Sequence, residues 1–158
     1  MQKTTSDPGD DEIRKIISAF ATLEGPLLQM LHALQHAYDH IPANAISVLA
    51  EVLNIGKAEI HGTITFYSDF RYKRPGRRVL KICRSEACQA RGGRPLADAA
   101  LRKLGVEWGG TTSDGKVTVE PVYCLGLCAC GPAAMLGDDL VARLDEEGMD
   151  RLLAEARS

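Results

Sequence analysis

Residues 119–136 read VEPVYCLGLCACGPAAML and form the most informative stretch of the chain. The stretch begins at the end of a strand-like alternation over residues 116–122 and passes into a turn that carries Cys124, Gly126 and Cys128. Because glycine has no side chain, the backbone of such a turn can come close to a bound inorganic group. An apolar, strand-like segment follows at 133–136. The stretch therefore predicts a cysteine-bearing loop between two strands.

A second pair of cysteines, Cys83 and Cys88, precedes this stretch. Residues 78–83 read RVLKIC, which predicts a strand that ends at the first cysteine of the pair. Each pair is therefore expected in a loop after a strand, where open α/β sheets usually bind their ligands. A [2Fe–2S] cluster needs four thiolates, two for each iron. The C-x4-C and C-x3-C spacings fit neither plant-type nor bacterial ferredoxin runs, and this disfavours both classes.

Three other interpretations of the four cysteines remain open at this point. Structural zinc accepts pairs of this spacing and would make the chain a zinc-stabilised interaction protein. Thiol–disulfide exchange on a redox fold usually requires C-x-x-C, which the chain lacks. Free cysteines are also common as small buried apolar residues. The occurrence of four of the five cysteines in two pairs favours a metal site over this last interpretation.

The fifth cysteine, Cys130, makes the ligand set ambiguous because it could replace Cys128 as the partner of Cys124. If the chain is extended here, Cys128 and Cys130 point to opposite sides and only one of them can face a cluster. We expect Cys130 to be a small buried neighbour of the site.

The periodicity of apolar residues predicts a helical segment followed by a mixed one. A tail is expected over residues 1–10, a helical domain over 11–70, a basic linker over 71–78 and an α/β domain over 79–158. Helices are predicted at 13–23, 26–41, 44–53, 57–70, 96–104 and 146–156, and strands at 78–83, 116–122, 133–136 and 140–144. The fold class is therefore α+β, with a small helical bundle before an α/β domain.

Composition limits the classes of function. A net charge of −2 gives no general attraction to nucleic acid, and no apolar run is long enough to be inserted in a membrane. The polar, acidic start lacks the core of a signal peptide, so we expect a soluble, cytoplasmic protein. No nucleophile–base set or acid pair indicates catalysis by the chain itself. The histidines at 32, 36 and 40 are expected to form a solvated or interface stripe rather than a metal site.

Several of these segments together resemble a known family. The second cysteine stretch is similar to the second cluster loop of the thioredoxin-like [2Fe–2S] subunits of NADH dehydrogenases. The run GTITFYSDF at 62–70 and the stretch TTSDGKVTVEPV at 111–122 match that family in the same order. The resemblance implies a thioredoxin-like α/β domain and one [2Fe–2S] cluster held by Cys83, Cys88, Cys124 and Cys128. It selects Cys128 over Cys130.

The resemblance also implies a role in a larger complex. The chain would be a non-catalytic electron-transfer subunit beside a flavoprotein that binds FMN, NAD and a [4Fe–4S] cluster. The first loop, CRSEACQARGG at 83–93, is most similar to the gamma subunit of soluble NAD-dependent formate dehydrogenase, which implies a larger molybdenum- or tungsten-containing catalytic partner. The alternatives within the family are respiratory NADH:quinone oxidoreductase and NAD-reducing hydrogenase.

Overall fold

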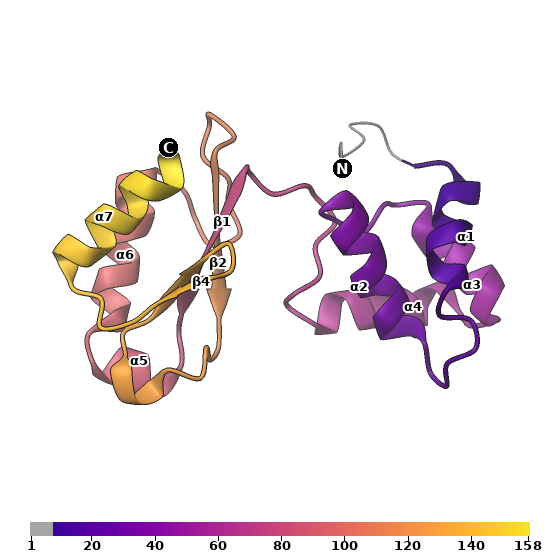
Figure 1. Ribbon diagram of the computed structural model, residues 1–158, viewed down its shortest axis with the longest axis horizontal. Coiled ribbons are helices and arrows are strands. Elements are labelled where there is room, and N and C mark those ends of the chain that lie inside the picture. Colours follow the sequence, from indigo (N-terminus) through magenta and orange to yellow (C-terminus); the bar gives the residue numbers. More distant parts are fainter. Residues whose placement is uncertain (1–7) are drawn as a thin grey trace. The chain divides into compact units, whose positions relative to one another are not determined.

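The computed structural model describes residues 8–158, which form two compact units that divide between Arg74 and Pro75 (Figure 1). Residues 1–7 of the tail expected over 1–10 lie outside the described part. Within residues 8–158, no helix combines the length and apolar character needed to cross a membrane. The α+β class is confirmed, with helices in the first unit and a sheet with helices in the second.

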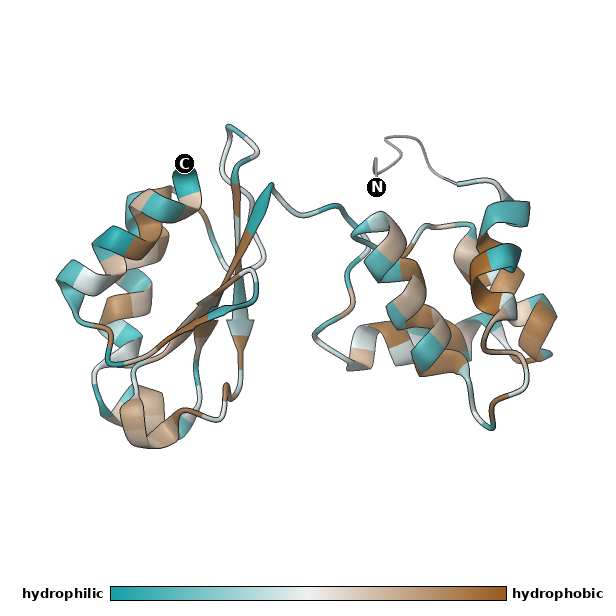
Figure 2. Cartoon of the chain, in the orientation of Figure 1, coloured by the Kyte–Doolittle hydropathy of each residue, from teal (hydrophilic) through white to brown (hydrophobic). Residues whose placement is uncertain are grey.

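The first unit consists of four helices around an apolar core. They are α1 (Asp10–Ser18), α2 (Leu27–Tyr38), α3 (Ala45–Leu53) and α4 (Lys57–Phe66). The apolar positions repeat every three or four residues, so one face of each helix is apolar, and these faces meet (Figure 2). The largest fully buried side chains here include Ile13, Met30, Leu34, Leu49 and Ile60.

Three predicted helices of this unit are too long. The first was expected to reach residue 23 but α1 ends at Ser18, and Leu23 is half exposed rather than part of the core face. The second was predicted over 26–41, but α2 ends at Tyr38 because Asp39 adopts a left-handed backbone. The last was expected to reach residue 70, but α4 ends at Phe66 because Tyr67 adopts an extended backbone. Phe66 itself is 80% exposed. Phe70, beyond the end of α4, is buried in the core although it is not helical, whereas Leu23 lies outside the core.

The second unit is a four-stranded sheet with two helices, α6 and α7, on one face (Figure 1). Its elements are β1 (Arg78–Cys83), α5 (Glu86–Ala90), α6 (Gly93–Leu104), β2 (Val117–Val122), the 3-10 turn η1 (Cys128–Cys130), β3 (Ala134–Leu136), β4 (Asp139–Val141) and α7 (Glu146–Arg157). The strand order is β2-β1-β3-β4. The short helix α5 was not predicted.

The register of the two central strands determines where the cysteines lie. β1 runs parallel to β2, with Cys83 opposite Val122, while β3 is antiparallel to β1. Alternate residues of β1, Leu80 and Ile82, point into the core beneath the helices. Because parallel strands end at the same edge, the segments that follow β1 and β2 emerge side by side.

Candidate metal centre

The four predicted ligand residues occupy this edge of the sheet. Cys83 is the last residue of β1, and Cys88 lies on α5, so the first pair is not carried by a simple loop as expected. Cys124 is in the loop after β2, and Cys128 begins η1. The parallel register therefore brings together two pairs that are distant in sequence.

The inner pair, Cys83 and Cys88, is buried, with 4% and 1% of each residue exposed. Burial opposes the ionisation of Cys83, but hydrogen bonds from Ser85, the Cys88 thiol and the Leu125 N–H outweigh it and lower the pKa of Cys83. The Ser85 hydroxyl lies 3.2 Å from the Cys83 sulfur. Burial raises the pKa of Cys88, as does its hydrogen bond to Cys83. The pKa values of the two thiols are therefore shifted in opposite directions, with Cys83 the more acidic of the pair.

The outer pair, Cys124 and Cys128, is exposed, and the two sulfurs are 3.7 Å apart. The N–H of Gly126 donates to the Cys124 sulfur at 3.3 Å. The hydrogen bond with Cys124 raises the pKa of Cys128, and the charges of Cys124, Cys88 and Cys83 add to this effect. The thiols of the two pairs therefore interact electrostatically.

Backbone N–H groups and a close backbone approach complete the site. The backbone N–H of Leu125 helps to lower the pKa of Cys83, and that of Ala133 opposes the rise in the pKa of Cys88. A β-carbon added to Gly131 would lie 3.1 Å from the Cys88 sulfur, so only glycine fits there without displacement. Val122, Leu125 and Leu127 pack against the inner pair. N–H donors to sulfur and an apolar cover are the surroundings through which a protein sets the potential of an iron–sulfur cluster.

This donor set fits a [2Fe–2S] cluster. Each pair of thiols matches the two ligands that one iron of such a cluster takes from the protein. Within residues 8–158, no three His, Cys, Asp or Glu side chains converge on a single metal-ion position. The thiols instead form two pairs, an arrangement suited to a two-metal core.

Cys130 is only partly buried, not fully buried as expected, and its sulfur contacts Arg143. The chain is not extended here, because residues 128–130 form the 3-10 turn. The Cys130 sulfur is 3.9 Å from the guanidinium of Arg143, and the Cys130 carbonyl accepts a hydrogen bond from the Arg143 N–H at 2.7 Å. Both contacts connect Cys130 to the segment after β4.

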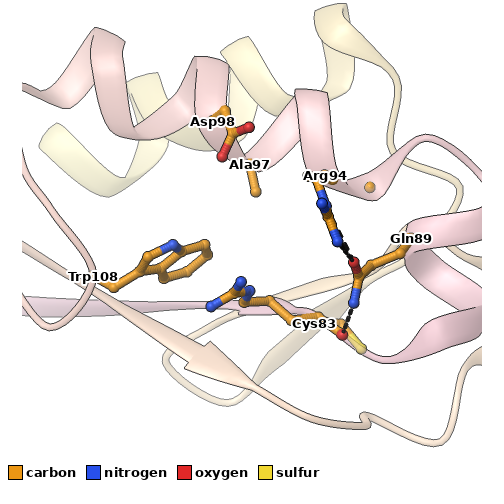
Figure 3. Close-up of a pocket in the computed structure, with 8 residues that line it drawn as sticks. Cys83, Gln89, Arg94, Ala97, Asp98 and Trp108 are labelled. Atoms are coloured by element: carbon orange, nitrogen blue, oxygen red, sulfur yellow. Dashed lines mark hydrogen bonds between the residues drawn. The ribbon is translucent and has the colours of Figure 1, made fainter.

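Polar side chains that the sequence did not single out surround Cys83. Gln89 donates to the Arg84 carbonyl at 2.6 Å and accepts from Arg94 at 2.7 Å (Figure 3). The Arg84 guanidinium lies 5.0 Å from the ring centre of Trp108, the single tryptophan of the chain. With Cys83, these residues line a small pocket beside the first cysteine loop. Neither spacing nor composition could have revealed contacts between α5, α6 and the segment before β2.

The predicted histidine stripe is only partly solvated. His32 and His36 are exposed, and the His32 ring packs 4.8 Å from that of Phe70. His40 lies beyond the end of α2 and is buried, with Nδ1 2.9 Å from the Tyr38 carbonyl oxygen. His40 is therefore not solvated, and the interface alternative stays a prediction.

Similarity to known proteins agrees with this geometry. Residues 13–157 match the family described as thioredoxin-like [2Fe-2S] ferredoxin. The chain belongs to this family. Membership in the thioredoxin-like [2Fe–2S] ferredoxin family supports one 2Fe–2S cluster, which the two cysteine pairs are suited to hold.

Two curated relatives of this thioredoxin-like [2Fe–2S] chain cover most of its length, and both are subunits of an NADH-quinone oxidoreductase. The relative from Escherichia coli (strain K12) is 35% identical over 126 residues, 80% of this chain and 76% of that protein. The relative from Buchnera aphidicola subsp. Baizongia pistaciae is 34% identical over 142 residues, 90% of this chain and 83% of that protein.

Two further relatives come from hydrogenases. The NADP-reducing hydrogenase subunit HndA of Solidesulfovibrio fructosivorans is 25% identical over 144 residues, 91% of this chain and 84% of that protein. A solved NAD+-reducing [NiFe]-hydrogenase in the air-oxidised state matches with a TM-score of 0.64 at 24% identity. That match covers 80% of this chain and 22% of the hydrogenase chain, and it shows a shared fold.

Proposed function

We propose that this chain is the [2Fe–2S] electron-transfer subunit of an NAD-linked oxidoreductase complex. Cys83, Cys88, Cys124 and Cys128 are the proposed ligands. The observation that carries the proposal is the meeting of the two thiol pairs at one sheet edge, with backbone N–H groups directed at their sulfurs. When bound, the cluster supplies one-electron oxidation and reduction.

The residues of the chain have three tasks in this role. The cysteines hold the cluster, and the Ser85 hydroxyl and backbone N–H groups stabilise negative charge on sulfur. Val122, Leu125 and Leu127 limit the access of water to the inner pair. Cys124 and Cys128 lie at the surface, so electrons have the shortest route to a partner on that side. None of these tasks requires an acid or a base from the protein.

The proposed partner is a flavoprotein that binds NAD, with FMN and a [4Fe–4S] cluster in the partner rather than in this chain. The relatives described above support a place in such a complex, because they are named as subunits of NADH-quinone oxidoreductases and of an NADP-reducing hydrogenase. We expect the assembled protein to be cytoplasmic.

The proposal also concerns the complex to which this subunit belongs. From the resemblance of the first loop, residues 83–93, we propose a molybdenum or tungsten formate dehydrogenase that converts formate and NAD+ to CO2 and NADH. The relatives favour the alternatives, a respiratory NADH:quinone oxidoreductase or a hydrogenase. The catalytic partner that co-purifies with the tagged chain from its native cells distinguishes the three.

Anaerobic purification of the full chain tests the cluster itself. We expect a coloured protein with two irons and two sulfides per chain, and an electron paramagnetic resonance signal after reduction. A colourless sample that contains zinc and cannot be reconstituted with iron and sulfide would overturn the proposal in favour of a zinc-stabilised interaction protein.

A further inference from the structure

Arg91 connects the two cysteine segments of this unit. It follows the short helix α5 directly, and its N–H donates to the Cys88 carbonyl at 3.3 Å. Its side chain extends to the other segment, where Nε donates to the Gly131 carbonyl at 2.8 Å. One residue thus contacts the helix that carries Cys88 and the segment that follows Cys128.

The contact is made where the two segments come closest. A β-carbon on Gly131 would lie 3.1 Å from the Cys88 sulfur and 3.4 Å from the Cys88 Cα. The Cδ of Arg91 would be 3.7 Å from the same point. The Arg91 hydrogen bond therefore fixes the backbone of the second segment directly beside the sulfur of an inner ligand.

We infer that Arg91 is a positioning residue that sets the separation between Cys88 and Cys128 and adds positive charge beside the cluster. The inference rests on the proposed function. A hydrogen bond from a guanidinium is charge-assisted and directional, so it resists displacement of its acceptor. Residues that orient metal ligands in this way typically contribute about 10- to 100-fold to metal affinity. The positive charge favours the reduced cluster, which carries one more electron.

Arg94 provides a matched control. It is also an exposed arginine near the same cysteine segment, and its guanidinium also donates a hydrogen bond. Its acceptor, however, is the Gln89 side chain on α5, so this bond does not reach the second segment. R94M changes the side chain in the same way as R91M, from a charged guanidinium to an uncharged thioether. It leaves the hydrogen bond between Arg91 and Gly131 intact.

The test compares the wild-type chain with R91M, R91K and R94M after anaerobic reconstitution. Bleaching by an iron chelator should be about 10-fold faster in R91M than in wild type, since the orienting bond is lost. R91M should also shift the resonance signal and make the reduction potential more negative. R91K should have the wild-type potential because it keeps the positive charge. It should regain only part of the chelator resistance that R91M loses. R94M should resist the chelator as wild type does.

Two results would overturn the inference. One is equal chelator resistance and equal resonance signals in R91M and R94M. The other is an R91K variant identical to R91M in potential. Thermal unfolding of the cluster-free chain shows whether R91M folds. If it does not, R91K replaces it in the test, and an R91K cluster that bleaches no faster than that of R94M counts against the inference. A wild-type chain that takes up no cluster overturns the proposed function as well, whereas a loaded wild type with an unaffected R91M overturns only the role of Arg91.

Discussion

The Ser85 hydroxyl lies 3.2 Å from the Cys83 sulfur and contributes to a lowered pKa of that thiol. A donor at this distance stabilises a negatively charged sulfur more than a neutral one. Ser85 precedes α5, but its side chain does not cap the helix, so its hydroxyl can be removed without losing a helix cap.

Replacing Ser85 with alanine should therefore raise the pKa of Cys83 in the cluster-free chain and lower the reduction potential of the loaded chain. We expect a negative shift of roughly 60 mV or less, which corresponds to a factor of ten in a one-electron equilibrium. Redox titration of the visible spectrum measures it. The S85T variant keeps the hydroxyl and should stay near wild type, so an equal shift in S85T would contradict the hydrogen-bond explanation.

Gly131→Ala should weaken the site by steric pressure. The added methyl group would lie 3.1 Å from the Cys88 sulfur, although the backbone of Gly131, with φ −64°, suits alanine. Overpacking of this kind costs about 1–3 kcal/mol of unfolding free energy. Urea unfolding and the rate of cluster loss both measure the effect.

Gly62→Ala is the matched control for this substitution. Gly62 lies in α4 with no atom within 4 Å of an added β-carbon. Alanine should stabilise that helix by about 0.5–1 kcal/mol. Equal losses of stability in G62A and G131A would show that the contact with Cys88 is not the cause.

Serine at each of Cys83, Cys88, Cys124 and Cys128 should abolish the native cluster spectrum, because the hydroxyl is a poor substitute for a thiolate. Cys130→Ser should retain it, since the Cys130 sulfur faces Arg143 rather than the other thiols. Iron content and the visible spectrum of the five variants are the measurements. A cluster kept by C128S and lost by C130S would reverse the assignment of the fourth ligand.

Protonation of Asp114 should make the second unit less stable in acid. Hydrogen bonds from the Thr112 hydroxyl and the Lys116 N–H lower the pKa of its carboxyl group. A lowered folded-state pKa stabilises the fold above the ordinary carboxyl pKa, and this contribution is lost as the pH falls through the folded value. In D114N, urea unfolding should therefore depend less on pH between neutrality and about pH 3. A D114N profile identical to that of the wild type would contradict this role of Asp114.

Three of the four predicted strands agree with the structure to within one residue at each end, whereas the strand predicted over 140–144 is β4, Asp139–Val141. The strand over 78–83 agrees with β1 at both ends, because its alternate residues Leu80 and Ile82 fill a core on one side of the sheet. Phe66 and Leu23 fit the apolar patterns of two predicted helices, yet Phe66 is largely exposed and Leu23 is half exposed. Periodicity records which residues are apolar, while burial depends on the elements that pack against them.

The cysteine pairs were visible in the sequence, but their surroundings were not. Spacing grouped Cys124 with Cys128, and the structure places their sulfurs 3.7 Å apart. The short helix α5 has only five residues, too few to show a periodic pattern. The contact of Arg91 with Gly131 joins residues 40 positions apart, so it depends on the sheet register and not on local sequence.

The unequal exposure of the two pairs has a consequence for how the protein matures. The core beneath α6 and α7 contains no cysteine, so this unit has an apolar core of its own apart from the metal site. Cys124 and Cys128 face solvent. Cys83 and Cys88 are buried, and Leu125 and Leu127 of the outer loop pack against them. With these four cysteines as the proposed ligands, we expect a scaffold protein that delivers a preformed cluster to meet the outer thiols first. The inner thiols would then bind last during maturation.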